Sequence, residues 1–230
     1  MTLPVHVARQ LWIQLRLLGL LVLPSAAAIV AVIVEGQVGS DAARLALGIG
    51  FAAAAVLSAA LVGTGFAEEV SSGAAAWLVL RAVPRNGVIG AWLELPMAVI
   101  LVAYVLAGIL AGLAIPPSLE RTPDPLSVAV AVVASTAPAF VLSAASVAIA
   151  VNASGRITAM ATVGGAAVLA IPLVLLGTSM VHPASGFWLA AGIAPGDRPL
   201  TVGLEAIGLC LALTAVIWVI AARRFARRDL

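Results

Sequence analysis

The sequence predicts an all-α, polytopic membrane protein, and three observations support this prediction. Of the 230 residues, 63% are hydrophobic and only 10% are charged, with a mean hydropathy of +1.18, whereas soluble domains are about 45–50% apolar and about 25% charged. Uncharged stretches long enough to cross a hydrocarbon core of about 30 Å, which takes about 20 helical residues, recur along the chain. These stretches lack the alternating polarity that a β-barrel requires, and too few polar residues exist to cover a soluble core.

Six of these stretches are expected to be transmembrane helices of a single domain that covers residues 1–230. Segments rich in Pro, Gly, Asn and Asp separate them, as turns between helices should be. In chain order the expected spans are about 17–34, 45–66, 88–115, 126–151, 157–181 and 201–222.

The segment 5–16 precedes the first span and has apolar residues at helical spacing with polar residues between them. This pattern is typical of an amphipathic helix that lies in the membrane interface. A cleaved signal peptide is the alternative, but the apolar run continues to Val34 and gives a full span instead.

Orientation follows from arginine, because the chain contains no lysine. With the N-terminus in the cytoplasm, nine arginines fall in cytoplasmic segments, and only Arg44, Arg121 and Arg198 fall in outer loops. This positive-inside bias predicts that both termini are cytoplasmic and that the number of spans is even. The chain is therefore expected in the cell (inner or plasma) membrane, in contact with membrane lipid. The net charge of +2 is accounted for by topology, so no nucleic-acid partner is expected.

Motifs for catalysis and metal binding are absent from the sequence. Cys210 is the single cysteine, and the topology puts His6 and His182 on opposite sides of the membrane, so neither a disulfide framework nor a histidine-pair metal site is expected. Without lysine the chain has no P-loop to bind nucleotide phosphates. We expect no enzyme activity and no cofactor in this chain, so any ATP hydrolysis requires a separate subunit.

The connector between the second and third spans, residues 66–85, has the sequence FAEEVSSGAAAWLVLRAVPR. It places two glutamates, two arginines and a tryptophan between uncharged stretches. Ser71 or Ser72 can cap the start of a helix, and Pro84 ends it. Two interpretations are open: an interfacial helix with Trp77 at the headgroup level, or a rigid docking helix that transmits motion to a cytoplasmic partner.

The order of residues in this connector resembles that in permeases of the ATP-binding cassette type-2 exporter family. In both, an acidic residue, a glycine, an amphipathic stretch and a Pro-Arg pair lead into the third span. The matching residues here are Glu68 or Glu69, Gly73, Trp77 to Leu80, Pro84 and Arg85. The ending WVIAARRFARRDL is similar to that family's usual terminus, and six spans with both termini inside also fit.

The resemblance implies a permease that moves an apolar or amphipathic substrate outward, using ATP and Mg²⁺ bound by a separate ATPase subunit. Two copies of the ATPase would assemble with two permeases, as a homodimer or a heterodimer. The connector would be the coupling helix, with Trp77 and Leu80 entering a cleft of the ATPase. Polar contacts around them would come from Glu68, Glu69, Arg81 and Arg85. The alternatives are a haem-exporter-like permease of cytochrome c maturation and a non-transporting membrane scaffold.

Glu94 and Glu205 are the charged residues inside expected spans, and both lie near span ends. A charge at the bilayer centre costs roughly 2.5–3.5 kcal/mol on the insertion scale. We expect Glu94 to pair with Arg81 or Arg85, and Glu205 with Arg198, in preference to a proton or substrate role. Gly108 and Gly112 form a G-x-x-x-G in the third span, a spacing that permits close helix approach.

Overall fold

The computed structural model describes residues 16–80, 84–114, 125–152 and 199–227. These residues form helices and no strands, so the all-α prediction is confirmed for the described part of the chain. The helices are α2 (Arg16–Val38), α3 (Ser40–Ser71), α4 (Ala74–Leu80), α5 (Arg85–Ala114), α6 (Pro125–Asn152) and α9 (Pro199–Ala226). All but α4 are long and apolar enough to cross a membrane, which gives five candidate spans. The expected interfacial helix at 5–16 and the expected span at 157–181 lie outside the described residues, apart from Arg16.

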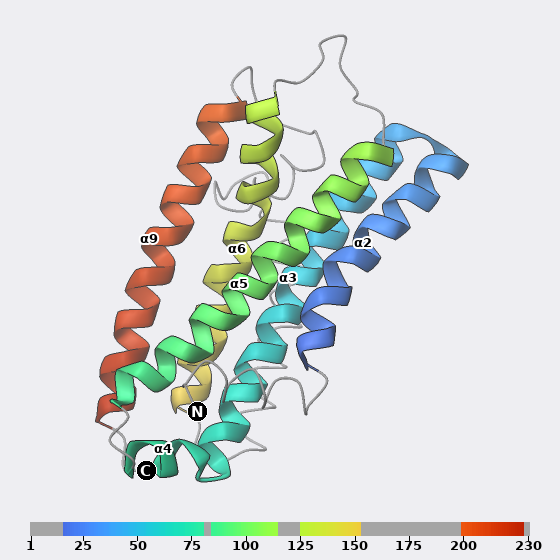
Figure 1. Ribbon diagram of the computed structural model, residues 1–230. Helices are drawn as coiled ribbons and strands as arrows, with labels where there is room; N and C mark the ends of the chain where they lie inside the picture. Colours follow the sequence, from blue (N-terminus) through green and yellow to red (C-terminus); the bar gives the residue numbers. More distant parts are fainter. Residues whose placement is uncertain (1–15, 81–83, 115–124, 153–198, 228–230) are drawn as a thin grey trace.

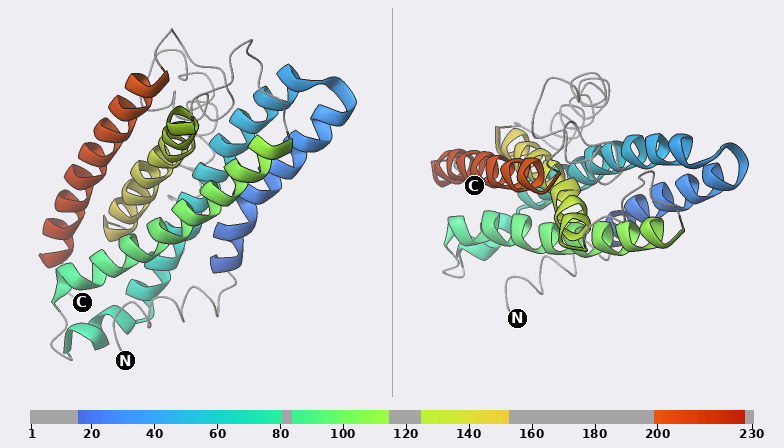
Figure 2. Two further views of the ribbon diagram at one scale, coloured as in Figure 1. Left: turned by 45° about the horizontal axis from the view of Figure 1, so that its top comes forward. Right: turned by 90° about the horizontal axis from the view of Figure 1, so that it is seen from above.

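The five long helices form one bundle, and α4 lies across one end of it (Figure 1). We call this end the α4 end. Helices α2 and α5 begin there, whereas α3, α6 and α9 end there, and the left view of Figure 2 shows the same arrangement. The described part of the chain therefore starts, at Arg16, and stops, at Arg227, on the same side of the bundle.

Helices α3 and α6 form the centre of the bundle. More than half of the residues in their membrane-crossing windows are buried, against less than a third in α2, α5 and α9. Helix α3 packs against α2 and α6, and α6 packs between α3 and α9. Both central helices are rich in Ala and Ser, and α3 also contains glycines. Such small residues let helix backbones approach closely where the surrounding lipid is as apolar as the side chains.

Glycine marks the closest helix contacts. A Cβ atom at Gly63 of α3 would lie 2.7 Å from the Cβ of Ser146 in α6, and one at Gly50 would lie 2.7 Å from the Cβ of Ala27 in α2. In the G-x-x-x-G of α5, Gly108 packs on Val132 of α6, whereas nothing lies within 4 Å of a Cβ at Gly112. The contact at Gly108 is therefore made within the chain.

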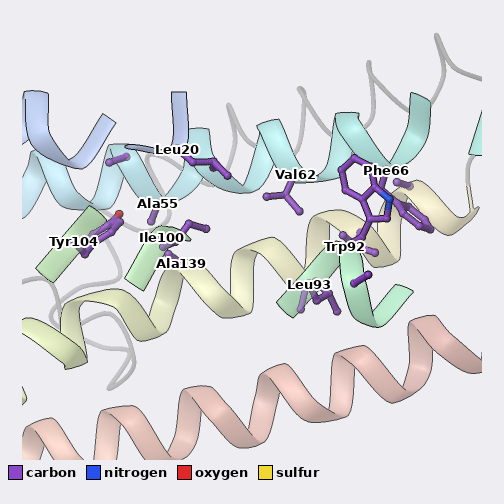
Figure 3. Packing of buried hydrophobic residues seen from close by; sticks show 14 of the residues in the cluster. Leu20, Ala55, Val62, Phe66, Trp92, Leu93, Ile100, Tyr104 and Ala139 are labelled. Carbon is purple, nitrogen blue, oxygen red and sulfur yellow. The ribbon is translucent and has the colours of Figure 1, made fainter. Parts of the chain in front are cut away.

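Aromatic side chains fill the space where α3 faces α5 (Figure 3). Tyr104 is fully buried, lies 4.9 Å from Phe51 between ring centroids, and donates its hydroxyl hydrogen to the Phe51 carbonyl at 2.7 Å. This bond satisfies the phenol inside an apolar core, where an unpaired hydroxyl would be costly. Nearer the α4 end, Phe66 and Trp92 pack edge to face with centroids 6.1 Å apart.

Apolar side chains are exposed on the outer faces of the bundle. Exposed residues with large apolar side chains occur along α2 and α9 and over the second half of α5, for example Ile33, Leu106 and Val216, each more than half exposed. Such faces are costly in water but match the hydrocarbon of a bilayer. The chain is therefore a multi-pass helical membrane protein.

Candidate functional site at the α4 end

Helix α4 owes its position to the short link that follows α3. The hydroxyls of Ser71 and Ser72 donate to the carbonyls of Glu68 and Glu69, at 3.2 Å each. They therefore bond the last turn of α3, and the expectation that one of them caps α4 is wrong. Gly73 then adopts a φ of 77°, a left-handed conformation that glycine reaches without strain.

The turn at Gly73 starts α4 directly, because the Gly73 carbonyl accepts the Trp77 backbone N–H at 3.0 Å. The prediction of a short helix in this connector is confirmed over Ala74–Leu80. Helix α4 lies across the end of the bundle between α3 and α5 (Figure 1).

The two faces of α4 differ in burial. Ala75 and Leu78 are buried against the bundle, whereas Trp77 is 49% exposed and Leu80 is 86% exposed. Residues three apart lie on one helix face, so Trp77 and Leu80 share the face that points away from the buried pair. A short helix with one face buried against the bundle thus presents two large apolar side chains outward.

Next to α4, an ion pair joins the start of α2 to the end of α3. The Nη2 atom of Arg16 lies 3.1 Å from Oε1 of Glu68, and the side chains are only 10% and 15% exposed. Gly65 makes room for this pair, because a Cβ there would lie 2.5 Å from Nη1 of Arg16 and 2.7 Å from Cζ3 of Trp92. Removing one member of so buried a pair takes the ion-pair partner from the other, which costs up to about 3–5 kcal/mol.

An aromatic cluster joins three helices at the same end. Phe66 of α3 contacts Trp92 of α5 and also Phe225 of α9, with the latter rings 5.7 Å apart between centroids. All three side chains are fully buried. Edge-to-face pairs of this kind contribute about 0.5–1.5 kcal/mol each beyond their burial, so the α4 end is a tightly packed part of the bundle.

Two arginine contacts hold the end of α9. Arg85, the first residue of α5, donates through Nη1 to the Ala226 carbonyl at 2.6 Å. Arg224 donates through Nη1 to Oδ1 of Asn152, the last residue of α6, at 3.2 Å. Cations stabilise the C-terminal end of a helix because unpaired carbonyls accumulate there. The start of α5 and the ends of α6 and α9 are therefore connected.

The structure brings most of the expected docking residues together. All but Arg81 lie in the end of α3, in α4, at the start of α5 or directly beside these helices: Glu68, Glu69, Gly73, Trp77, Leu80, Pro84 and Arg85. Glu69 is buried, with 4% exposure. Arg81 lies outside the described residues.

Glu94 and Glu205 are not part of this group. Glu94 is exposed on α5, and within the described part of the chain no ion pair joins it to Arg85. The guanidinium of Arg85 bonds the end of α9 instead, so the expected Glu94–Arg85 pair is not formed. Glu205 is exposed near the start of α9, at the opposite end of the bundle, and its expected partner Arg198 is outside the described residues.

The sequence reasoning missed Arg16, Trp92 and Phe225 as members of this site. The sequence places Arg16 in the expected interfacial helix. When the first two spans are antiparallel, however, a cation at the start of the first lies beside a carboxylate at the end of the second, as Arg16 and Glu68 do. The aromatic pair carries no sequence signal beyond its position near span ends.

Fold and site together define a helical membrane protein with a short helix across one end of its bundle. Among the residues that the structure describes, no group of three or more His, Cys, Asp or Glu side chains is placed to hold a metal ion. No protein-family model and no curated protein matches the chain.

Proposed function

We propose that the chain is the permease subunit of an ATP-binding cassette exporter and that α4 is its coupling helix. The observation that supports this best is the exposed pair on α4, Trp77 and Leu80, on a helix whose other face is buried. The ATPase is a separate chain that binds ATP and Mg²⁺ and receives this pair in an apolar cleft. The resemblance of the connector to those of type-2 exporter permeases gives the proposal its family.

The contacts around α4 supply a route for motion. A push on α4 acts on α3 through the turn at Gly73 and on α5 through its first residue, Arg85. Arg85 bonds the end of α9, and Arg224 of α9 bonds the end of α6. Rigid-body movement of a short helix therefore acts on helices throughout the bundle, which is how coupled transporters shift between packed states.

The topology belongs to the proposal as well. Helix α6 ends at the α4 end and α9 begins at the opposite end (Figure 1), so residues 153–198 connect opposite ends of the bundle. A sixth span within them, at 157–181, is the arrangement we propose, with both termini and α4 in the cytoplasm.

The proposed complex holds two permeases, identical or related, and two ATPases in the cell membrane. Its substrate is apolar or amphipathic and moves outward. The described spans consist mainly of Ala, Val and Leu, with scattered hydroxyl side chains such as those of Ser58 and Ser143. This composition is compatible with an apolar or amphipathic substrate.

The test is recruitment of the ATP-binding cassette ATPase encoded nearest to this chain's gene. We expect the double variant Trp77→Ala with Leu80→Ala to insert normally and to lose ATPase co-purification by tenfold or more, because a buried aromatic anchor contributes about 2 kcal/mol or more. The matched control is Leu113→Ala, which removes a side chain that is 84% exposed at the opposite end of the bundle.

Three outcomes contradict the proposal. If the double variant binds and stimulates the ATPase like the original chain, α4 is not the docking element. If the double variant fails to insert while the control inserts, α4 is an interfacial anchor. If the ATPase binds but its hydrolysis is never linked to movement of any solute in liposomes, the chain is a scaffold.

A further inference from the structure

Helix α9 carries a continuous exposed stripe that changes character along its length. Its members follow one another at spacings of four, three, four, three and four residues, so they share one helix face. They are Leu209, Leu213, Val216, Ile220, Arg223 and Arg227, and all six are exposed. We call this set the α9 stripe: four apolar residues followed by two arginines.

The two arginines of the stripe have no polar partner within the described part of the chain. Neither Arg223 nor Arg227 forms a side-chain hydrogen bond or ion pair with another described residue. Arg224, which lies between them on a different face, is bound to Asn152 of α6. Two guanidinium groups, each with a planar set of donors suited to phosphate oxygens, therefore face outward one turn apart.

The apolar part of the stripe has the length of one membrane leaflet. Ile220 lies eleven positions after Leu209, which is a distance of about 16 Å along the helix axis. This distance is close to half of a hydrocarbon core of about 30 Å. Arg223 and Arg227 follow at the α4 end, within two turns of the last apolar residue of the stripe. Arginine side chains in this position extend toward the headgroups while their stems remain along the apolar surface.

The arginines project from a helix end that is held firmly. Phe225 is fully buried against Phe66, and the Ala226 carbonyl accepts a hydrogen bond from the Arg85 guanidinium. Helix α2, which also exposes apolar residues, has a different end: its Arg16 is buried in the ion pair with Glu68. Among the described spans, α9 is the one whose exposed apolar stripe ends in arginines that bond no other described side chain.

We propose that the α9 stripe binds an anionic phospholipid from the leaflet at the α4 end. An acyl chain lies along the four apolar residues, and the phosphate with its net negative headgroup lies between Arg223 and Arg227. A zwitterionic lipid offers the same chain and phosphate, but its ammonium group opposes the two guanidinium groups, so charge sets the preference. The inference does not depend on the proposed transport function.

The experiment compares lipids retained by the purified full-length chain. The protein is equilibrated in mixed micelles of phosphatidylglycerol and phosphatidylcholine with identical acyl chains, and bound lipids are counted by native mass spectrometry. We expect a preference for phosphatidylglycerol that falls on the order of 25-fold in Arg223→Gln with Arg227→Gln, from the usual strength of an arginine at an anionic surface. The preference should also weaken as salt is raised.

Two further variants control for charge and folding. Arg224→Gln removes one positive charge from the neighbouring face and should keep the preference. Arg223→Lys with Arg227→Lys keeps both charges of the stripe and should keep most of the preference. A thermal melt of each variant in the same micelles identifies any that fail to fold.

The proposal is overturned if the original chain retains both lipids equally, or if Arg224→Gln lowers the preference as much as the stripe variant does. It is also overturned if the stripe variant loses a chain–chain dimer rather than lipid, since the occupant would then be a second copy.

Discussion

Replacing Gly63 tests the packing at the centre of the bundle. A Cβ at this position would lie 2.7 Å from Cβ, 2.9 Å from Oγ and 3.0 Å from the carbonyl oxygen of Ser146, whereas ordinary contacts are 3.4–4 Å. In Gly63→Ala, α3 and α6 must therefore separate by several tenths of an ångström, and a side-chain rotation cannot relieve the contact with the backbone oxygen. Overpacking of this kind costs about 1–3 kcal/mol.

Alanine also favours the helix over glycine by about 1 kcal/mol, which offsets part of that cost. The net loss is about 0–2 kcal/mol, or at most roughly 8 °C in melting temperature for a chain of this size, so the variant is judged against a glycine-to-alanine change that meets no contact. The assay is a thermal melt in detergent followed by circular dichroism.

Gly112→Ala is the matched control, because it makes the same chemical change where nothing lies within 4 Å. It should leave the melting temperature unchanged or raise it. Adding Ser146→Gly to Gly63→Ala removes two of the three close atoms and should recover part of the loss, a coupling that a double-mutant cycle measures. Equal melting temperatures for Gly63→Ala and Gly112→Ala would refute the close approach of α3 and α6.

Three further predictions use other contacts. Tyr104→Phe removes the 2.7 Å bond to the Phe51 carbonyl and should cost about 0.5–1.5 kcal/mol; a melting temperature equal to that of the original chain would contradict the buried bond. Arg16→Gln removes the ion-pair partner of the largely buried Glu68 carboxylate and should cost up to about 3–5 kcal/mol, while Arg16→Gln with Glu68→Gln should be less damaging; a double variant worse than the sum of the singles would argue against the ion pair. For topology, Val38→Cys should react with an impermeant thiol reagent added outside intact cells and Ser72→Cys should not, since these exposed positions lie at opposite ends of the bundle; the reverse pattern would place α4 outside the cell.

Hydropathy placed the five spans that the structure describes but not the ends of their helices. The second span was expected at 45–66, and α3 runs from Ser40 to Ser71, five residues further at each end. Asp41, Arg44, Glu68 and Glu69 end the uncharged run without ending the helix, because charged residues are compatible with helical backbone wherever water, headgroups or a partner receives them. With about 48 Å of length, α3 extends beyond the hydrocarbon core.

Contacts between helices required the three-dimensional arrangement. Glu94 was expected to pair with Arg81 or Arg85, yet the Arg85 guanidinium bonds the carbonyl of Ala226, 141 residues away. The ion pair of Arg16 with Glu68 likewise depends on α2 and α3 being antiparallel neighbours. Local sequence determines which residues are polar near a membrane surface, and the packing of the bundle determines which of them meet.

Helix α4 could be predicted from the sequence, but the orientation of its side chains could not. Composition predicted a short helix, and Ala74–Leu80 is one. It did not reveal which side chains face outward, because seven residues give too short a periodic signal and Trp77, Leu78 and Leu80 are all apolar. The structure separates Leu78, which is buried, from Trp77 and Leu80, which are exposed.

The most direct measurement of the proposed coupling role is site-specific crosslinking from α4. A photoreactive benzoylphenylalanine is incorporated in place of Leu80, and in a second, matched preparation in place of Leu113, in cells that co-express the neighbouring ATPase. If α4 is the coupling helix, ultraviolet light produces a covalent product with the ATPase from position 80 and none from position 113. The yield of the product from position 80 changes when ATP is bound. Crosslinking of position 80 to lipid alone, with the ATPase present at normal levels, would contradict the proposed coupling role.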